Sequence, residues 1–275
     1  MLQPPGFANK NIPGHICRLK KELYGLKQTP RAWYTELWIF QLSLGFVNST
    51  ADSFLFINHK PGVTLYLLVY VDDIIVTRSS PAEVSTLIAT LAARFSLKDL
   101  GCLNYSLGVE VIPSTAGIFI SQRKYITDLL HKPGMAADTK PTSTPLSATN
   151  KLLKDSGDFL PSPTEHQALV GSLQYLSLTR PYIAFNTNKL AQFMQNLRTV
   201  HWTALKRVLK YLAGSCDKGV SISTTTPLNI HAYSDADWAG DKDDYISTTG
   251  YLLYLGSTPI SWSSRKQRFV AQTST

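Results

Sequence analysis

Residues 65–76, LYLLVYVDDIIV, place two adjacent carboxylates between two runs of apolar residues. Short runs rich in Val, Ile, Leu and Tyr are typical of β-strands, so Asp72 and Asp73 are predicted at the tip of a hairpin. Two neighbouring charges are stable there if the turn is solvated or if they hold a cation. Because Asp is an ordinary turn residue, a plain turn is the simpler alternative for an isolated Asp-Asp pair.

The residues around the two acids favour a cation site over a plain turn. Tyr-x-Asp-Asp followed by Ile74-Ile75-Val76 is far more specific than Asp-Asp alone. Mg²⁺ prefers hard oxygen ligands and usually bridges one or two carboxylates to substrate phosphates. Paired metal ions can then activate an attacking hydroxyl and stabilise the leaving oxygen in phosphoryl transfer.

Helices and antiparallel strands alternate on both sides of this hairpin, which predicts an α+β fold. A helix is expected to start at Thr29-Pro30 and to end near Gly45, and Ser80-Pro81-Ala82-Glu83 is a capping box before a second helix. Further helices are predicted near 123–131, 165–178, 181–197 and 200–213, and strands near 53–57, 64–71, 74–78, 104–112, 117–121, 229–234, 249–255 and 259–263. The last three strands have no covering helix after them, so we expect a truncated domain.

Composition limits the class of protein. The 275 residues are 44% apolar and 17% charged, which is typical of globular domains, and the net charge of +8 favours a polyanionic partner such as nucleic acid. A mildly basic protein without such a partner is the alternative. Three scattered cysteines match no zinc spacing, and no apolar stretch is long enough to span a membrane. We therefore expect an intracellular protein, cytoplasmic or nuclear, that does not enter the membrane.

An ordered series of motifs resembles one family. Tyr70-Val71-Asp72-Asp73 resembles the polymerase signature of reverse transcriptases, and residues 19–34, LKKELYGLKQTPRAWY, resemble the second motif of the copia type of long-terminal-repeat retrotransposon. The match continues through Gln3-Pro4-Pro5-Gly6-Phe7, Lys98-Asp99-Leu100-Gly101, Leu107-Gly108-Val109-Glu110-Val111, Gln122-Arg123-Lys124-Tyr125, residues 170–176, Thr179-Arg180-Pro181 and residues 233–240. The resemblance covers essentially the whole chain, so an unrelated metal-binding α+β protein is a poor alternative.

The resemblance implies three regions. Residues 1–122 would form a reverse-transcriptase palm with part of the fingers, 123–225 a helical thumb and connection, and 226–275 the start of a ribonuclease H-like β unit. In the palm, Asp72 and Asp73 would bind Mg²⁺ (or Mn²⁺). The nucleotide and template would be bordered by Tyr70, Gly25, Gln28 and Arg31, and the primer grip would include Leu107 and Gly108. The implied partners are an RNA template, a DNA primer or duplex, and deoxynucleoside triphosphates.

Asp235 would be the first metal-binding carboxylate of the ribonuclease H-like region. Four more acids crowd the same loop, Asp237, Asp241, Asp243 and Asp244. A calcium loop of the EF-hand type is excluded, since Ala239 and Ile246 stand where ligands are required. The acids beyond Asp235 are therefore predicted to lie in a solvated loop.

Two departures from the family bear on activity. The family requires a further palm carboxylate upstream, but Glu22 and Glu36 are the only acids before Asp52, and both lie in or beside the second motif. The later ribonuclease H carboxylates are also absent. We therefore predict a copia-type Pol segment, truncated at both ends, with little polymerase activity of its own. The alternative is a non-catalytic nucleic-acid-binding remnant or the product of a decayed transposon gene.

Overall fold

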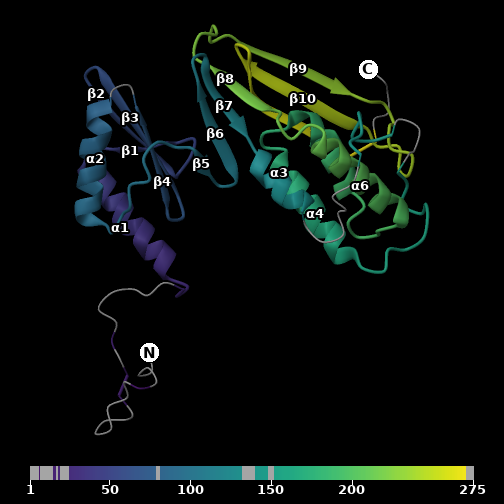
Figure 1. Cartoon of the computed structure of the whole chain (residues 1–275), viewed down its shortest axis with the longest axis horizontal. Helices are drawn as coiled ribbons and strands as arrows, with labels where there is room; N and C mark the ends of the chain where they lie inside the picture. The colour runs from purple at the N-terminus through teal and green to yellow at the C-terminus, as the bar shows by residue number, and fades with distance from the viewer. Residues whose placement is uncertain are drawn as a thin grey trace. The chain divides into compact units, whose positions relative to one another are not determined.

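A computed structural model of the chain describes residues 6, 15–16, 18, 25–78, 81–131, 140–147 and 152–270. It forms two compact units, Met1–Gly101 and Cys102–Thr275. Figure 1 shows the elements of each unit. Both units combine α-helices with antiparallel sheets, so the predicted α+β class is confirmed.

The first unit is one antiparallel sheet with two helices. The sheet has the strand order β1-β2-β3-β4. Its elements are α1 (Thr29–Ser43), β1 (Val47–Asn48), β2 (Leu55–Lys60), β3 (Val63–Tyr70), β4 (Asp73–Arg78) and α2 (Pro81–Arg94). The predicted hairpin and its flanking helices are therefore confirmed, while Ser80, which would provide the hydroxyl of the capping box, lies outside the described residues.

Both helices pack on the same face of this sheet. Burial alternates along β3, since Leu65, Leu67 and Val69 are buried and the residues between them are exposed. The three buried side chains share one hydrophobic cluster with Leu37 of α1 and with Leu87 and Leu91 of α2. Because alternate strand residues point to opposite faces, both helices cover one face, and no other described element covers the opposite face.

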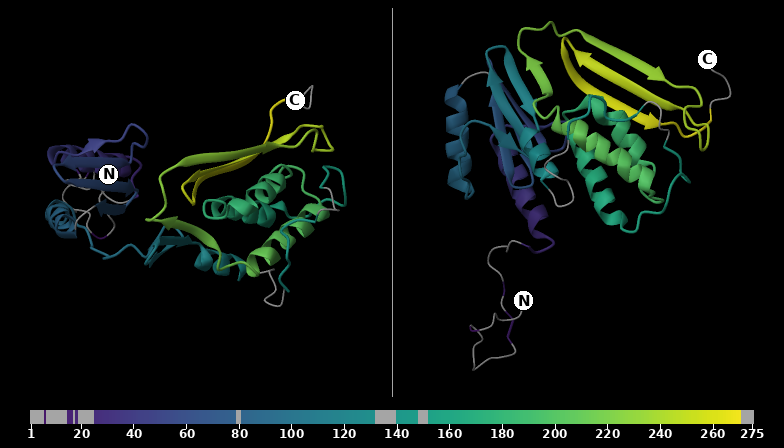
Figure 2. Two further views of the ribbon diagram at one scale, coloured as in Figure 1. Left: turned by 90° about the horizontal axis from the view of Figure 1, so that it is seen from above. Right: turned by 45° about the vertical axis from the view of Figure 1, so that its right-hand side comes forward.

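The second unit contains two further antiparallel sheets and a group of helices. One sheet has the order β5-β6-β7-β8 and the other β11-β10-β9. Figure 2 shows β9, β10 and β11 lying over the helices of the same unit. The elements are β5 (Tyr105–Ser106), β6 (Val109–Ser114), β7 (Gly117–Ser121), α3 (Arg123–Leu130), α4 (Pro163–Leu176), the 3₁₀ turn η1 (Pro181–Ile183), α5 (Ala184–Ala191), α6 (Thr199–Ala213), β8 (Gly219–Ser223), β9 (Ile230–Ala236), β10 (Thr248–Leu255) and β11 (Thr258–Lys266).

Strand β8 is a feature that the sequence did not reveal. It pairs along the whole of β7, from Gly117↔Ser223 to Ser121↔Gly219. The backbones of β7 and β8 approach closely here: a Cβ on Gly219 would lie 2.2 Å from the carbonyl oxygen of Ile120. The sheet thus joins residues 105–121 to residues 219–223. The boundary between the two compact units falls after Gly101 in the sequence. The functional regions 1–122, 123–225 and 226–275 stay predictions.

The helices of the second unit enclose one apolar core. Ile126, Leu173, Leu190, Leu205 and Leu209, from α3 to α6, are fully buried in it.

The helix predicted over 181–197 is shorter than expected. The backbone of Leu160 donates to Leu197 and that of Thr199 donates to Asp158, so a short antiparallel contact replaces the last helical turn. Among the described residues, no helix combines the length and apolar character that crossing a bilayer requires.

His166 of α4 is a polar exception in this core. It is fully buried, and its ring nitrogens make no hydrogen bond of ordinary geometry with the described residues. Burial lowers the pKa of His166 to about 4, although the backbone of His201 favours protonation. In the unfolded chain the imidazole of His166 takes up a proton near pH 6.5. The free energy of unfolding therefore falls as the pH drops from about 6.5 towards 4.

Replacing His166 by Leu should therefore stabilise the second unit, mainly in acid. We expect a gain in the free energy of unfolding of about 1–3 kcal/mol at pH 5, since the variant removes a buried unpaired polar group and its proton linkage. Urea unfolding at pH 5 and pH 8 measures this gain. His201, whose pKa burial also lowers, keeps its own acid dependence. If the free energy of unfolding of His166→Leu changed between pH 5 and pH 8 by as much as that of the wild type, this explanation would be contradicted.

Candidate nucleotide and metal site

The tip of the β3–β4 hairpin carries both predicted carboxylates. Strand β3 ends at Tyr70 and β4 begins at Asp73, so the loop consists of Val71 and Asp72. Tyr70 and Asp73 face each other as a cross-strand pair. Both side chains of such a pair lie on the same face of a sheet. The register therefore places the carboxylate of Asp73 beside Tyr70.

The face that holds Asp73 is the one that the helices leave uncovered. Tyr66, Leu68 and Tyr70 of β3 are exposed on it, with Tyr70 52% exposed. Leu68 pairs with Ile75 of β4, which extends the apolar surface sideways. An apolar, aromatic-bearing sheet face that ends in two acids is suited to a ligand with both flat apolar and charged parts.

Val71 holds the tip in a strained conformation. Its φ is 52°, in the left-handed region, which a β-branched residue rarely adopts. A two-residue hairpin loop commonly requires positive φ at its first position, where glycine is preferred. Such strain costs of the order of 1–3 kcal/mol and persists when the flanking strands fix the loop.

The variant Val71→Gly should relieve this strain. We expect the free energy of unfolding of the first unit to rise by about 0.5–1 kcal/mol, because the removed strain exceeds the added freedom of glycine in the unfolded chain. Val71→Ala is the matched control, since it removes the branch but keeps the Cβ that resists positive φ. Urea unfolding should rank Gly above Ala, and the reverse order would contradict a strained tip.

Asp72 and Asp73 meet only part of what a magnesium ion requires. Both are exposed and offer hard oxygen donors. Among the described residues, however, no group of three or more His, Cys, Asp or Glu side chains is placed to hold a metal ion. The pair therefore fits an ion that takes its remaining ligands from substrate phosphates and water.

The structure does not link the other predicted palm residues to this tip. Gly25 has a φ of 91°, which explains glycine there, Gln28 is the N-cap of α1, and Arg31 is exposed in its first turn. Within the described part of the chain, no hydrogen bond or ion pair joins them to Tyr70, Asp72 or Asp73. Their roles stay predictions.

The predicted primer-grip residues lie in the second unit. Leu107 and Gly108 form the two-residue loop between β5 and β6, with φ of 50° and 73°. The hydroxyl of Tyr175 in α4 donates to the carbonyl of Leu107. A Cβ on Gly108 would lie 3.2 Å from the ring of Tyr175, so this loop is held tightly against α4.

Asp235 lies on β9 and lines a cleft. Its Oδ1 accepts the backbone N–H of Ala236 at 2.9 Å, and it faces Gly250 across the strands. The cleft, of about 480 Å³, is also lined by Asp237, Tyr182 and Trp262. Asp237 Oδ1 accepts the N–H of Thr248 at 2.6 Å, which fixes that carboxylate at the start of β10. We call this the acidic cleft.

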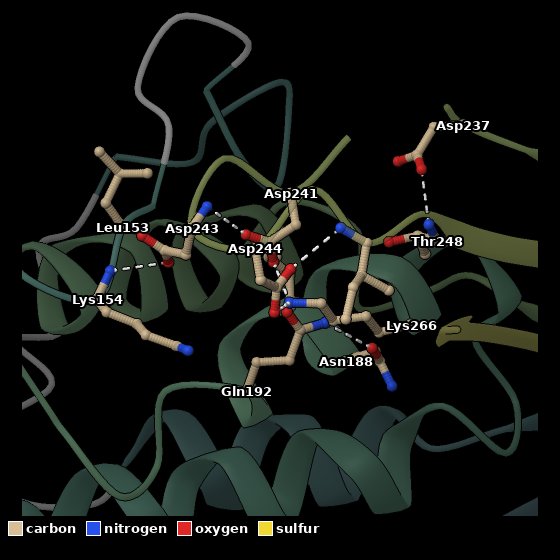
Figure 3. Close-up of polar contacts among 12 residues, drawn as sticks. Leu153, Lys154, Asn188, Gln192, Asp237, Asp241, Asp243, Asp244, Thr248 and Lys266 are labelled. Atoms are coloured by element: carbon tan, nitrogen blue, oxygen red, sulfur yellow. Dashed lines mark hydrogen bonds and ion pairs between the residues drawn. The ribbon is translucent and has the colours of Figure 1, made fainter. Parts of the chain in front are cut away.

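The predicted solvated loop beyond Asp235 is wrong for Asp241. That residue is only 4% exposed, and its Oδ2 accepts hydrogen bonds from Lys189 at 2.8 Å and Lys266 at 2.7 Å. Lys266 also pairs with Asp244 at 2.7 Å. We call this group the Asp241 cluster: Lys189, Asp241, Asp244 and Lys266. Figure 3 shows Asp241, Asp244 and Lys266 close together. The cluster joins α5 to the end of β11.

The two lysines set the ionisation of the Asp241 cluster. Burial alone would raise the pKa of Asp241, but hydrogen bonds from Lys189 and Lys266 hold it well below its usual range. Burial likewise opposes the charge of Lys266, yet its hydrogen bonds to Asp241 and Asp244 raise its pKa. Asp241 and Lys266 therefore stay charged at neutral pH. The sequence offered no sign of the cluster beyond the crowded acids.

Comparisons with known proteins agree with the motifs. A family model described as reverse transcriptase (RNA-dependent DNA polymerase) matches residues 1–148. The chain is 49% identical over its whole length to the retrovirus-related Pol polyprotein from transposon RE2 of Arabidopsis thaliana, and covers 19% of that protein. It is 33% identical to the Pol polyprotein from transposon TNT 1-94 of Nicotiana tabacum, of which it covers 21%.

A shorter relative aligns over most of its own length. An uncharacterized mitochondrial protein of Arabidopsis thaliana is 41% identical over 211 residues, which are 77% of this chain and 87% of the relative. The chain thus spans about a fifth of the Pol polyproteins, with 19% and 21% covered in the two cases above. No solved structure matches it.

Proposed function

Because the chain belongs to the reverse transcriptase family and corresponds to a region of copia-type retrotransposon Pol polyproteins, we propose that its first unit serves RNA-directed DNA synthesis. The observation that carries the proposal is the uncovered sheet face on which Asp73 lies beside Tyr70. This face would receive the primer end and the incoming nucleotide. The chain spans about a fifth of each polyprotein, 19% for RE2, so the activity of the whole Pol protein is part of the proposal.

Each part of the tip has a separate task in this proposal. Asp72 and Asp73 would hold Mg²⁺ (or Mn²⁺) against the triphosphate of a deoxynucleotide. When bound, the ion neutralises phosphate charge and lowers the pKa of the attacking hydroxyl. Tyr70 would position the sugar and base by contact with its ring, and Tyr66 and Leu68 would exclude water beneath the primer strand. The strained Val71 fixes the two acids before a ligand arrives.

The finer division of the chain belongs to the same proposal. Residues 1–122 would act as the palm with part of the fingers, with Gly25, Gln28 and Arg31 towards the nucleotide and template. Residues 123–225 would act as thumb and connection, and Leu107 and Gly108 would contact the primer. Residues 226–275 would be the beginning of a ribonuclease H-like region with Asp235 as a metal ligand. An RNA template and a DNA primer would be the partners.

The 275-residue chain alone should synthesise little DNA. Two carboxylates alone are too few protein ligands for a pair of metal ions. The only acids before Asp52 are Glu22 and Glu36. Primer extension on an RNA template with Mg²⁺ tests this expectation, with Asp72→Asn as the matched control. We expect equal, near-background extension by both proteins. Robust synthesis that disappears in Asp72→Asn would refute the expected inactivity and would support the catalytic assignment of the tip.

A second candidate function is nucleic-acid binding without catalysis. The net charge of +8 and the exposed tyrosines of β3 favour it. Gel-shift titration at 50 mM and 200 mM salt separates this function from inert protein, because phosphate contacts make affinity fall steeply as salt rises. Absence of binding at the lower salt concentration would leave neither function standing for the chain alone.

A further inference from the structure

Strand β9 forms an open edge of the three-stranded sheet in the unit Cys102–Thr275 (Figure 1). It pairs with β10 on one side, and no strand among the described residues pairs with its other side. All seven residues of β9 are exposed, with Ile230 71% and Tyr233 64% exposed. Natural edge strands are commonly protected from further pairing by lysine, proline or a β-bulge. Strand β9, IHAYSDA, contains neither residue, and its register with β10 is continuous, so its edge is open to another strand.

Hydrogen bonds at the two ends of β9 define which of its backbone groups face the open side. The carbonyl of Asn229 accepts the N–H of Gly256 at 2.8 Å, and the N–H of Asp237 donates to the carbonyl of Thr248 at 3.1 Å. In an antiparallel pair, residues that bond to the neighbouring strand alternate with residues whose backbone groups point away from it. The odd-numbered residues of β9 therefore bond to β10, and the N–H and C=O groups of its even-numbered residues face the open side.

The carboxylate of Asp235 lies towards this open side. Its Oδ1 accepts the N–H of Ala236 at 2.9 Å, and that N–H is one of the open-side groups. Within the described chain, the open-side groups of Ile230, Ala232 and Ser234 make no hydrogen bond. Backbone donors and acceptors of this kind bond to water in a single chain and are available to a partner strand.

Strand β9 is complementary to a second copy of itself. Antiparallel pairing over its whole length places Ile230 opposite Ala236, and Tyr233 opposite Tyr233 of the second copy. Even-numbered residues then face even-numbered residues, so the open-side groups of the two copies can bond to one another. His231 lies opposite Asp235 of the second copy on the same face of the sheet, and the twofold axis produces this pair twice. Hydrogen bonding and charge therefore both match in this register.

The rings around His231 position it for this pair. The imidazole stacks on Tyr254 of β10, with ring centroids 5.1 Å apart and planes 4° apart, and it lies nearly perpendicular to the ring of Tyr233 at 5.8 Å. A side chain that is fixed before association loses less entropy when the pair forms. Cross-strand pairs that exchange no backbone hydrogen bond have the closer side chains. The two copies of Tyr233 form such a pair and would cover each other at the twofold axis.

We propose that two copies of the chain associate through β9, in the register that pairs Tyr233 with Tyr233, so that three strands from each copy form one continuous sheet. His231 of each copy then reaches Asp235 of the other, which lines the acidic cleft, so each copy contributes a side chain to the cleft of its partner. Seven residues from each copy make a small interface, so we expect a Kd on the order of 10 µM. The proposal does not rest on the proposed function, because this pairing requires neither nucleic acid nor a metal ion.

Sedimentation velocity of the full chain, without nucleic acid and between about 1 and 200 µM, measures the association. The wild type should pass from monomer to dimer over this range. Ala232→Pro removes one open-side N–H and leaves the hydrogen bonds to β10 intact, so it should weaken association at least about tenfold. His231→Asp places like charges opposite each other and should weaken it by about tenfold.

Exchange of the two charged residues tests the pairing itself. The double variant His231→Asp/Asp235→His restores opposite partners in the same register, so it should recover most of the affinity that His231→Asp loses. His131→Asp is the matched control, because it makes the same change at an exposed histidine at the end of α3. Its Kd should stay within about twofold of the wild type.

Cross-linking tests the register. In a chain whose three native cysteines are replaced by serine, Tyr233→Cys should form a disulfide between copies on oxidation, since opposite Cβ atoms lie about 4.5–5.5 Å apart. Ile230→Cys faces Ala236 of the second copy and should stay largely unlinked. A monomer at every concentration, wild-type association in Ala232→Pro, no recovery in the double variant, or equal cross-linking at both positions would overturn the proposal. Each of these results would leave the proposed function standing, because primer extension and gel shift test it separately.

Discussion

Asp241→Asn is expected to lower the free energy of unfolding of the unit Cys102–Thr275 by about 3–5 kcal/mol at pH 7. The variant keeps the shape of the side chain but removes the charge that Lys189 and Lys266 share. The two lysine side chains are only 17% and 20% exposed, so their ammonium groups would be left partly desolvated without a counter-ion. Breaking a buried ion pair from one side costs several kcal/mol for this reason.

The effect should depend on pH with a defined sign. The pKa of Asp241 is lower in the folded chain than in the unfolded one. Its contribution is therefore complete above about pH 4 and is lost as the pH falls below that value. The free energies of unfolding of wild type and Asp241→Asn, measured by urea unfolding, should approach each other as the pH falls below about 4. A difference that does not shrink in acid would contradict the ionic origin.

Asp128→Asn provides the matched control for this experiment. Asp128 is exposed on α3 in the same unit, and no hydrogen bond or ion pair involves its side chain among the described residues. The same chemical change there should alter the free energy of unfolding by less than about 0.5 kcal/mol. A loss below about 1 kcal/mol in Asp241→Asn would mean that the cluster contributes no more than a surface ion pair.

Arg180→Ala should destabilise the same unit by a similar amount, about 3–5 kcal/mol. Arg180 is fully buried just before η1. Its guanidinium donates to the carbonyls of Ser215 at 2.6 Å and Cys216 at 2.9 Å, and to the hydroxyl of Tyr182 at 2.5 Å. Within the described chain no carboxylate pairs with it.

The charge of Arg180 is met instead by backbone carbonyls of the turn that follows α6. Ser215 and Cys216 come after Gly214, the C-cap of α6, and their carbonyls present partial negative charge to the guanidinium. Truncation of Arg180 removes two donors from the carbonyl groups of Ser215 and Cys216, leaves Ser215 with only the N–H of Lys218 among the described residues, and creates a cavity. Arg180→Lys should recover only part of the stability, because one ammonium cannot reproduce the fork.

Arg123→Ala, an exposed change on α3, is the control for the Arg180 variants. It should shift the urea midpoint little, while Arg180→Ala shifts it strongly with an unchanged slope of the transition. Equal midpoints for Arg180→Ala and Arg123→Ala would show that the turn after α6 does not need the guanidinium.

Local pattern was enough to predict most of the first unit, although it gave no sign of the short strand β1. The apolar runs on both sides of the acids at 72–73 define two strands and a turn within a short segment, and Thr29-Pro30 marks the start of α1. The same information could not predict β8, because its partner β7 is about a hundred residues earlier and five residues, GVSIS, are too few to mark a strand by themselves.

The charged groups divide in the same way. Asp72, Asp73 and Asp235 could be singled out because each lies in a recognisable motif. The Asp241 cluster could not, since Lys189 and Lys266 are 52 and 25 residues away from Asp241 and only the packing of α5 against β11 brings them together. Likewise, the strain at Val71 is invisible in a residue type that is common in strands.

The most direct test of the central claim is metal-directed cleavage at the hairpin tip. Fe²⁺ would replace Mg²⁺ in the presence of an RNA–DNA hybrid and a deoxynucleotide, and ascorbate and peroxide would generate radicals at the bound ion. We predict backbone cuts beside Val71 and Asp72 that disappear in the double variant Asp72→Asn/Asp73→Asn. Cuts that persist in the double variant, or that are absent from this segment in the wild type, would contradict a metal site between β3 and β4.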